Sequence, residues 1–71
     1  MNKLPFSLDA LHAFEAAARL RSFKLAAAEL NVTATAVSHR IRKLEEQLGK
    51  PLFVRKVREV ALTEEGAWLL A

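Results

Sequence analysis

Apolar residues recur at helical spacing in successive stretches of the chain, and a residue that favours helix N-caps precedes each stretch. The first stretch follows Ser7 and predicts a helix over residues 8–20. Its apolar positions are Leu8, Leu11, Phe14 and Ala18. Asp9 in the first turn, and Arg19 and Arg21 at the end, carry the charges that the helix dipole favours at those places.

A second, shorter helix is predicted from Phe23 to Leu30, after the cap candidate Ser22. Its three consecutive alanines, residues 26–28, have side chains small enough to let another helix approach closely. Asn31 then suits a left-handed turn residue. A third helix begins after the cap candidate Thr33, so the two short helices and their turn have the outline of a helix-turn-helix.

This third helix divides sharply into an apolar and a polar side. At 100° per residue, its apolar positions fall on one narrow stripe. They are Val37, Ile41, Leu44 and Leu48. The opposite side carries Thr35, Ser38, His39 and Arg42, with Arg40 and Lys43 on the flanks. Gly49 and Pro51 end the helix.

The period changes after the third helix, where β-branched and aromatic residues flank a basic centre. The pattern predicts a two-stranded hairpin with strands at residues 52–54 and 60–62 and the sequence RKVRE at its tip. Thr63 is a fourth cap candidate, and two glutamates follow it in the first turn of another helix. Because the sequence stops about two turns into that helix, we expect a piece of a longer protein. The alternative is a naturally short protein whose last helix docks on the domain.

Composition narrows the class of protein. The 71 residues suffice for one domain, and 52% apolar residues with two glycines and two prolines favour helices. The absence of cysteine excludes a disulfide framework, a cysteine zinc site and thiol catalysis, and fits a reducing cytoplasm. Polar residues interrupt the N-terminal apolar run, and no stretch approaches the length of a membrane span, so we expect neither a signal peptide nor a membrane segment.

The net charge is +3, and the positive charges are clustered. Of the eleven Lys and Arg, three lie in residues 40–43 and four in residues 50–58. Two such clusters are the footprint expected for a phosphate backbone. The alternative is a solvated surface with a chance excess of Lys and Arg. For the basic hairpin, the alternative is a charged loop that keeps an edge strand soluble.

The polar side of the third helix predicts contacts with DNA. An α-helix fits the major groove, and hydroxyl, imidazole and guanidinium groups bond base edges or phosphates. The base-reading candidates are Thr35, Ser38, His39 and Arg42. The phosphate and hairpin candidates are Ser22, Thr33, Arg40, Lys43, Arg55, Lys56 and Arg58. Glu45 and Glu46 would repel phosphate, so the contact zone is expected to end near Lys43.

The sequence does not predict an enzyme. Ser38 and His39 are adjacent on a helix, so their side chains point about 100° apart and cannot act as nucleophile and base. Neither His12 nor His39 has a carboxylate at metal-ligand spacing, and there is no glycine-rich phosphate loop. We therefore predict no catalytic and no metal-binding residue. The remaining alternatives to DNA binding are a protein-interaction domain that docks an acidic partner, and double-stranded RNA binding.

Residues 13–66 resemble the N-terminal DNA-binding domain of LysR-type transcriptional regulators. The residues that carry the resemblance at fixed spacing are Ser22-Phe23, Ala26-Ala27, Leu30, Ala36-Val37-Ser38, Ile41, Leu44-Glu45, Leu48-Gly49, Leu52-Phe53, Arg55, Arg58, Leu62-Thr63 and Gly66. The opening residues and the Ser-His pair after Val37 look like the branch that contains the glycine-cleavage and β-lactamase regulators.

The resemblance implies a mainly α fold with a small β-hairpin, a winged helix-turn-helix. The implied boundaries are 6–63 for the whole domain, 23–42 for the helix-turn-helix, 34–48 for the recognition helix in the major groove, 52–62 for the wing, and 64–71 for the start of a linker helix. The linker helix would pair two subunits, with Trp68 and Leu69 as candidates for the dimer interface.

The resemblance also implies partners. The DNA would be a pseudo-palindromic promoter site, and the protein would form a homodimer that assembles into a homotetramer at full length, in the cytoplasm at the nucleoid, without a membrane. We expect no cofactor in this chain, because a small-molecule effector would bind a C-terminal domain that this sequence does not include.

One position departs from the family pattern. Many members have Gln at the second residue of the motif T-Q-x-A-V-S, and here that residue is Ala34. Gln makes a bidentate contact with adenine worth ~1–3 kcal/mol of discrimination, whereas Ala offers apolar contact to a thymine methyl. Ala34 is therefore a base-reading candidate with an altered preference. Lys24, where the family often has Thr, adds a phosphate candidate.

Overall fold

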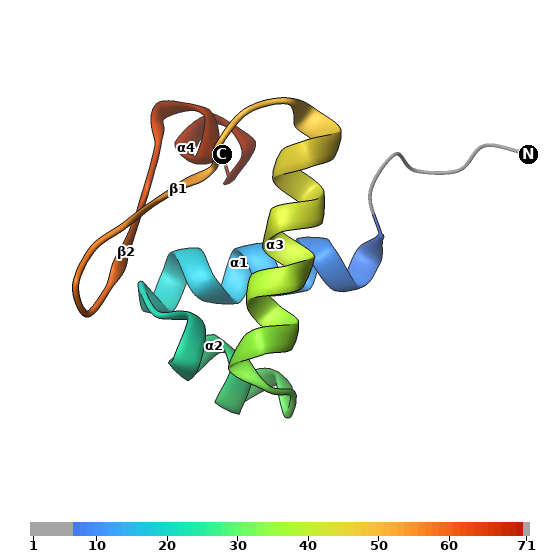
Figure 1. Ribbon diagram of the computed structural model, residues 1–71, viewed down its shortest axis with the longest axis vertical. Coiled ribbons are helices and arrows are strands. Elements are labelled where there is room, and N and C mark those ends of the chain that lie inside the picture. Colours follow the sequence, from blue (N-terminus) through green and yellow to red (C-terminus); the bar gives the residue numbers. More distant parts are fainter. Residues whose placement is uncertain (1–6, 71) are drawn as a thin grey trace, which may run out of the picture.

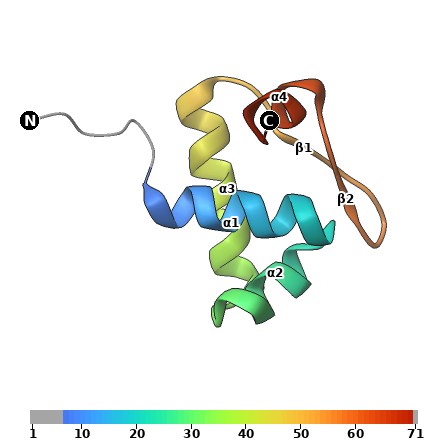
Figure 2. The same cartoon turned by 180° about the vertical axis from the view of Figure 1, so that it is seen from behind.

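The computed structural model describes residues 7–70, which form four helices and one two-stranded antiparallel hairpin (Figure 1). The helices are α1 (Leu8–Leu20), α2 (Phe23–Leu30), α3 (Ala34–Leu48) and α4 (Glu64–Leu70), and the strands are β1 (Phe53–Arg55) and β2 (Val60–Leu62). Helix α3 crosses α1 steeply, while the hairpin and α4 lie to one side of this crossing (Figures 1 and 2). The predicted fold class is confirmed, and the expected outer limits at residues 6 and 71 lie outside the described residues.

All four predicted cap residues cap their helices. The side-chain oxygens of Ser7, Ser22 and Thr33 each accept a hydrogen bond, 3.0 Å long, from the backbone N–H three residues further on. Thr63 does the same for Gly66 at 3.0 Å. Each bond satisfies one of the amides that a helix start leaves without a partner. The helices therefore begin where the sequence predicts.

Left-handed residues end the first three helices. Asn31 has φ 63° as predicted, and Gly49 has φ 70°. Arg21 also has φ 55°, although the sequence suggested only that its charge complements the helix dipole. Its carbonyl oxygen accepts a hydrogen bond of 3.1 Å from the Val60 N–H. The turn between α1 and α2 therefore holds the second strand of the hairpin.

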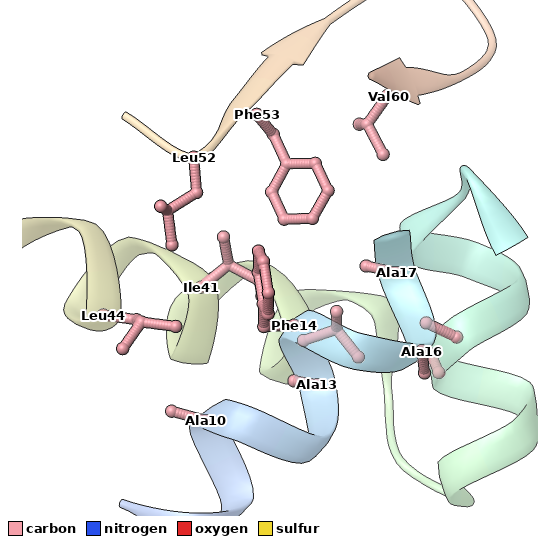
Figure 3. Packing of buried hydrophobic residues seen from close by; sticks show 13 residues of the cluster. Ala10, Ala13, Phe14, Ala16, Ala17, Ile41, Leu44, Leu52, Phe53 and Val60 are labelled. Atoms are coloured by element: carbon pink, nitrogen blue, oxygen red, sulfur yellow. The ribbon is translucent and has the colours of Figure 1, made fainter. Parts of the chain in front are cut away.

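The core lies where α1, α3 and the hairpin meet (Figure 3). Val37, Ile41 and Leu44 are fully buried, and Leu48 is half-buried at the edge of the predicted stripe. Helices α1 and α2 bury small side chains, and of the predicted alanine run Ala26 and Ala27 are buried while Ala28 is exposed. The buried alanines are Ala10, Ala13, Ala16 and Ala17 in α1 and Ala26 and Ala27 in α2. Leu8, the first residue of the apolar pattern that predicted α1, is 61% exposed, on a first turn that lies beyond the α3 crossing (Figure 1).

The hairpin begins one residue later than predicted. Phe53 pairs with Leu62 and Arg55 pairs with Val60, so the first strand is not residues 52–54. Arg55 belongs to β1 and not to the tip. The tip is the four residues between the strands, closed by a hydrogen bond of 2.8 Å from the Lys56 N–H to the Glu59 carbonyl oxygen.

Hydrogen bonds hold the segment before β1 from two sides, so Leu52 does not join the ladder between the strands. The Glu45 carboxylate accepts hydrogen bonds from the backbone N–H groups of Leu52 and Phe53 at 2.8 and 3.3 Å. From the other side, the Thr63 N–H donates to the Leu52 carbonyl oxygen at 2.9 Å, and the Thr63 hydroxyl donates to the Pro51 carbonyl oxygen at 2.7 Å. Glu45 is therefore an anchor for the hairpin as well as the limit of the predicted contact zone.

Arg19 joins α1 to α2 on the surface. Its guanidinium donates to the carboxylate of Glu15, with 2.9 Å between Nε and Oε2, and to both carboxylate oxygens of Glu29. Hydrogen bonds from Arg19 are the main reason that the pKa of each of these carboxyl groups lies below its ordinary value of 4.5. The same hydrogen bonds, first the ones that Arg19 donates to Glu29 and then those to Glu15, raise the pKa of Arg19.

Replacing Arg19 with Gln is expected to lower the melting temperature slightly at neutral pH, because exposed ion pairs contribute little. The two carboxyl groups have lowered pKa values in the folded state, so their contribution is present above about pH 4.5 and is lost as the pH falls through those values. Thermal unfolding at about pH 7 and about pH 3 measures this. Lys24→Gln, which removes a charge outside the ion pairs of residues 7–70, is the control. An equal loss for Arg19→Gln at both pH values would contradict the prediction.

Candidate nucleic-acid interface

The predicted base-reading side of α3 lies at the surface. Ala34, Thr35, His39 and Arg42 are exposed and Ser38 is half-buried; we call these five residues the reading face. Of the flanking cations, Lys43 is exposed and Arg40 is half-buried. Because the opposite side of α3 is fixed in the core, the reading face is presented to solvent as a rigid surface.

The start of α2 and the wing line an open basic hollow of about 270 Å³. It is lined by Ser22, Phe23, Lys24 and residues 55–60. Arg55, Lys56, Arg58 and Lys24 supply positive charge, and Glu59 is the carboxylate in the lining. A helix start favours an anion, and the first residues of α2 lie in this lining beside the four cations. This basic hollow is suited to a phosphate group.

Arg55 connects the wing to both helices of the helix-turn-helix. Its guanidinium carbon lies 4.9 Å from the centroid of the Phe23 ring, and its Nη1 donates to the Ser38 hydroxyl oxygen at 3.3 Å. The sequence placed Arg55 among the phosphate contacts and Ser38 among the base readers, with no signal that they touch. They are 17 residues apart, so no local pattern could show the contact.

The wing tip presents two cations and one apolar side chain. Lys56 and Arg58 are exposed as predicted, and Val57 between them is 97% exposed. The sequence did not single out Val57.

The two predicted interface residues of α4 differ in environment. Trp68 is 80% exposed, whereas Leu69 is half-buried and packs against the core. With the end of α3 they line a hollow of about 190 Å³, together with Leu48, Lys50, Leu52 and Glu65. This hollow lies at the opposite end of α3 from the basic hollow, so Trp68 is available to a partner that does not cover the reading face.

Neither a metal centre nor a membrane span is found within residues 7–70. In that part of the chain no three His, Cys, Asp or Glu side chains are grouped so that they could hold a metal ion. The same residues include no helix with the length and apolar character needed to cross a membrane.

The sequence from residue 8 to residue 67 matches the family described as "Bacterial regulatory helix-turn-helix protein, lysR family". The chain belongs to the LysR family. This LysR-family domain is 58% identical over 69 residues to the HTH-type transcriptional activator AmpR of Providencia stuartii, a match that covers 97% of the chain and 23% of AmpR. It is 54% identical over 66 residues to the glycine cleavage system transcriptional activator of Escherichia coli (strain K12), covering 93% of the chain and 22% of the activator. The relatives thus include an AmpR and the glycine cleavage activator, the two kinds of regulator that the sequence resembles.

Solved structures of LysR-family proteins have the same fold. The crystal structure of a CbnR_DBD–DNA complex superposes with a TM-score of 0.89 at 29% identity, over 92% of this chain and 75% of that one. The family and this fold identify the chain as a DNA-binding domain and do not favour the docking of an acidic protein partner. The relatives are transcription regulators, which agrees with the prediction that the domain is not an enzyme. The chain spans about a fifth of the length of the curated relatives it matches.

Proposed function

We propose that this domain binds specific sites on double-stranded DNA, with the first half of α3 in the major groove and the wing on the adjacent backbone and minor groove. The observation that carries the proposal is the exposed reading face beside the basic hollow. An α-helix fits the major groove, and the residues near the N-terminus of a recognition helix contact base edges. The same fold in a DNA complex supports this docking.

Base reading falls to the reading face. Arg42 is suited to guanine, which offers two acceptors in the major groove, and hydroxyl groups bond several bases. Ala34 lies exposed in the first turn of α3 and offers a methyl group to thymine in place of an amide to adenine. We expect this domain to prefer thymine over adenine as the base that the Ala34 methyl group contacts.

Phosphate contacts fall to the cations and helix starts around the reading face. They come from Ser22, Lys24, Thr33, Arg40, Lys43, Lys56 and Arg58. Such contacts set position and affinity without reading the sequence, and they make binding depend on salt. An arginine of the wing would also fit a narrow minor groove, whose negative potential attracts it.

Arg42→Ala and Arg58→Ala are expected to act differently on binding. The loss of Arg42 should remove ~1–3 kcal/mol of discrimination at one base pair, because it removes a base contact. The loss of Arg58 should weaken binding to all sequences alike and reduce the salt slope by about 1, because it removes a phosphate contact. Selection of bound sites from random duplex DNA, followed by titrations at several salt concentrations, measures both effects.

Two results would count against this assignment. If the unsubstituted domain enriches no sequence at any salt concentration, specific DNA binding is excluded. If both variants lose affinity uniformly, the domain binds DNA but α3 does not read it through Arg42.

For the whole protein we propose a homodimer that forms a homotetramer at full length and binds a pseudo-palindromic promoter site. Exposure of Trp68 on α4 supports pairing of two copies there, and a two-fold pair of domains matches two half-sites. We also propose that a small-molecule effector binds a domain outside this sequence and that the protein acts on the nucleoid in the cytoplasm.

A further inference from the structure

Arg55 is the side chain at which the three elements of the DNA-facing surface meet. It belongs to β1, lies over Phe23 at the start of α2, and donates to Ser38 on α3. The Phe23 ring packs edge-on against Phe53, 5.5 Å between centroids at 89°, so the platform beneath Arg55 is fixed to the core. Within residues 7–70 no carboxylate forms an ion pair with Arg55. Its contacts inside the domain therefore go to the helix-turn-helix.

The hydrogen bond from Arg55 restricts what Ser38 can do. A serine hydroxyl has one hydrogen to donate and two lone pairs that accept, whereas a guanidinium only donates. With Arg55 Nη1 at one lone pair, the hydroxyl hydrogen stays free, and a second donor would approach beside a positive charge. Ser38 is thereby prepared to donate to an acceptor on DNA, such as purine N7 or thymine O4.

On the basis of the DNA binding proposed above, we infer that Arg55 is a positioning residue for base reading. It fixes the wing against α2 through Phe23 and orients the Ser38 hydroxyl toward the bases. This role differs from that of Arg58, whose predicted phosphate contact adds affinity without sequence preference. It also requires arginine, because a planar guanidinium can stack on a ring while its N–H groups donate, and a lysine ammonium is a single point charge.

The test compares site preferences of the unsubstituted domain, Ser38→Ala, Arg55→Ala, the double variant with both of these substitutions, and Arg55→Lys. Arg58→Ala is the matched control. Sites are selected from random duplex DNA, and the dissociation constant of each protein is measured for the selected duplex and its single-base variants. Arg55 is exposed, so the variants should fold, and thermal unfolding verifies this.

We expect Ser38→Ala and Arg55→Ala to lose preference at the same base pair, each by about tenfold, and the double variant to lose no more than either one. Arg55→Lys should restore the overall affinity and the salt slope but not that preference. Arg58→Ala should weaken all duplexes equally and keep the preference. A merely structural role of Arg55 would not confine the loss to the base pair that Ser38 reads.

The inference fails if Arg55→Ala weakens all duplexes equally, if lysine restores the preference, or if Arg55 and Ser38 affect different base pairs. In each of these cases the unsubstituted domain still selects a site, so the proposed function stands. If the unsubstituted domain selects no site, the proposed function and the inference fail together.

Discussion

Phe53→Ala is expected to cost about 3–5 kcal/mol of folding free energy, the range for truncating a large buried side chain. Phe53 is buried on β1, and its ring lies next to that of Phe14 (Figure 3). The centroid of the Phe53 ring is 5.5 Å from those of both Phe14 and Phe23. The substitution therefore leaves a cavity between the wing and the first two helices. A domain of this length has a total stability of similar size, so a large fraction of Phe53→Ala should be unfolded at 37 °C.

Urea unfolding measures this loss, with two companion variants. Phe53→Leu keeps much of the buried volume and should retain a cooperative transition at lower urea. Val54→Ala is the matched control, because Val54 is the next residue on the same strand but is 50% exposed. If Phe53→Ala costs no more than Val54→Ala, the wing does not take part in the core.

Gly66→Ala is expected to destabilise the domain although alanine is the better helix former. Alanine gains up to about 1 kcal/mol over glycine within a helix. At this position, however, a Cβ would lie 2.8 Å from Leu62 Cδ2 and closer still to the Leu52 carbonyl oxygen. That oxygen cannot move away freely, because it accepts the hydrogen bond from the Thr63 N–H. Overpacking of about 1–3 kcal/mol should exceed the gain in helix propensity.

The measurement is the free energy of unfolding. The control is the reverse substitution at the next residue, Ala67→Gly. Ala67 is exposed on the same helix, so glycine there should cost only the difference in propensity, about 1 kcal/mol or less. Both substitutions should therefore destabilise the domain. A more stable Gly66→Ala variant would mean that α4 does not pack closely on the segment before β1.

The helices could be predicted from the sequence because their signals are local. A cap hydroxyl accepts a hydrogen bond from an amide three residues away, as those of Ser22 and Thr33 do. The apolar residues of α3 recur every three or four positions, which is about one helical turn. The outward position of Thr35, His39 and Arg42 follows from the same period. These features depend on residues that lie close together along the chain, where spacing alone determines geometry.

The features that sequence reasoning missed depend on contacts between distant residues. The predicted bounds of the first strand were wrong by one residue, and Glu45 bonds amides there that lie seven and eight residues away along the chain. Arg55 was placed at the tip because nothing in the RKVRE segment indicates its contacts with Phe23 and Ser38. The chemistry of the DNA-facing surface could thus be predicted, but not the way in which its parts are joined.

The exposed indole on α4 has a practical consequence for experiments. The chain contains a single tryptophan, Trp68, at the opposite end of α3 from the basic hollow. Its fluorescence should be that of a water-exposed indole in the isolated domain and should shift to shorter wavelength when a second copy covers α4. DNA bound at the reading face should leave this emission unchanged. One unlabelled spectrum can therefore distinguish self-association from DNA binding.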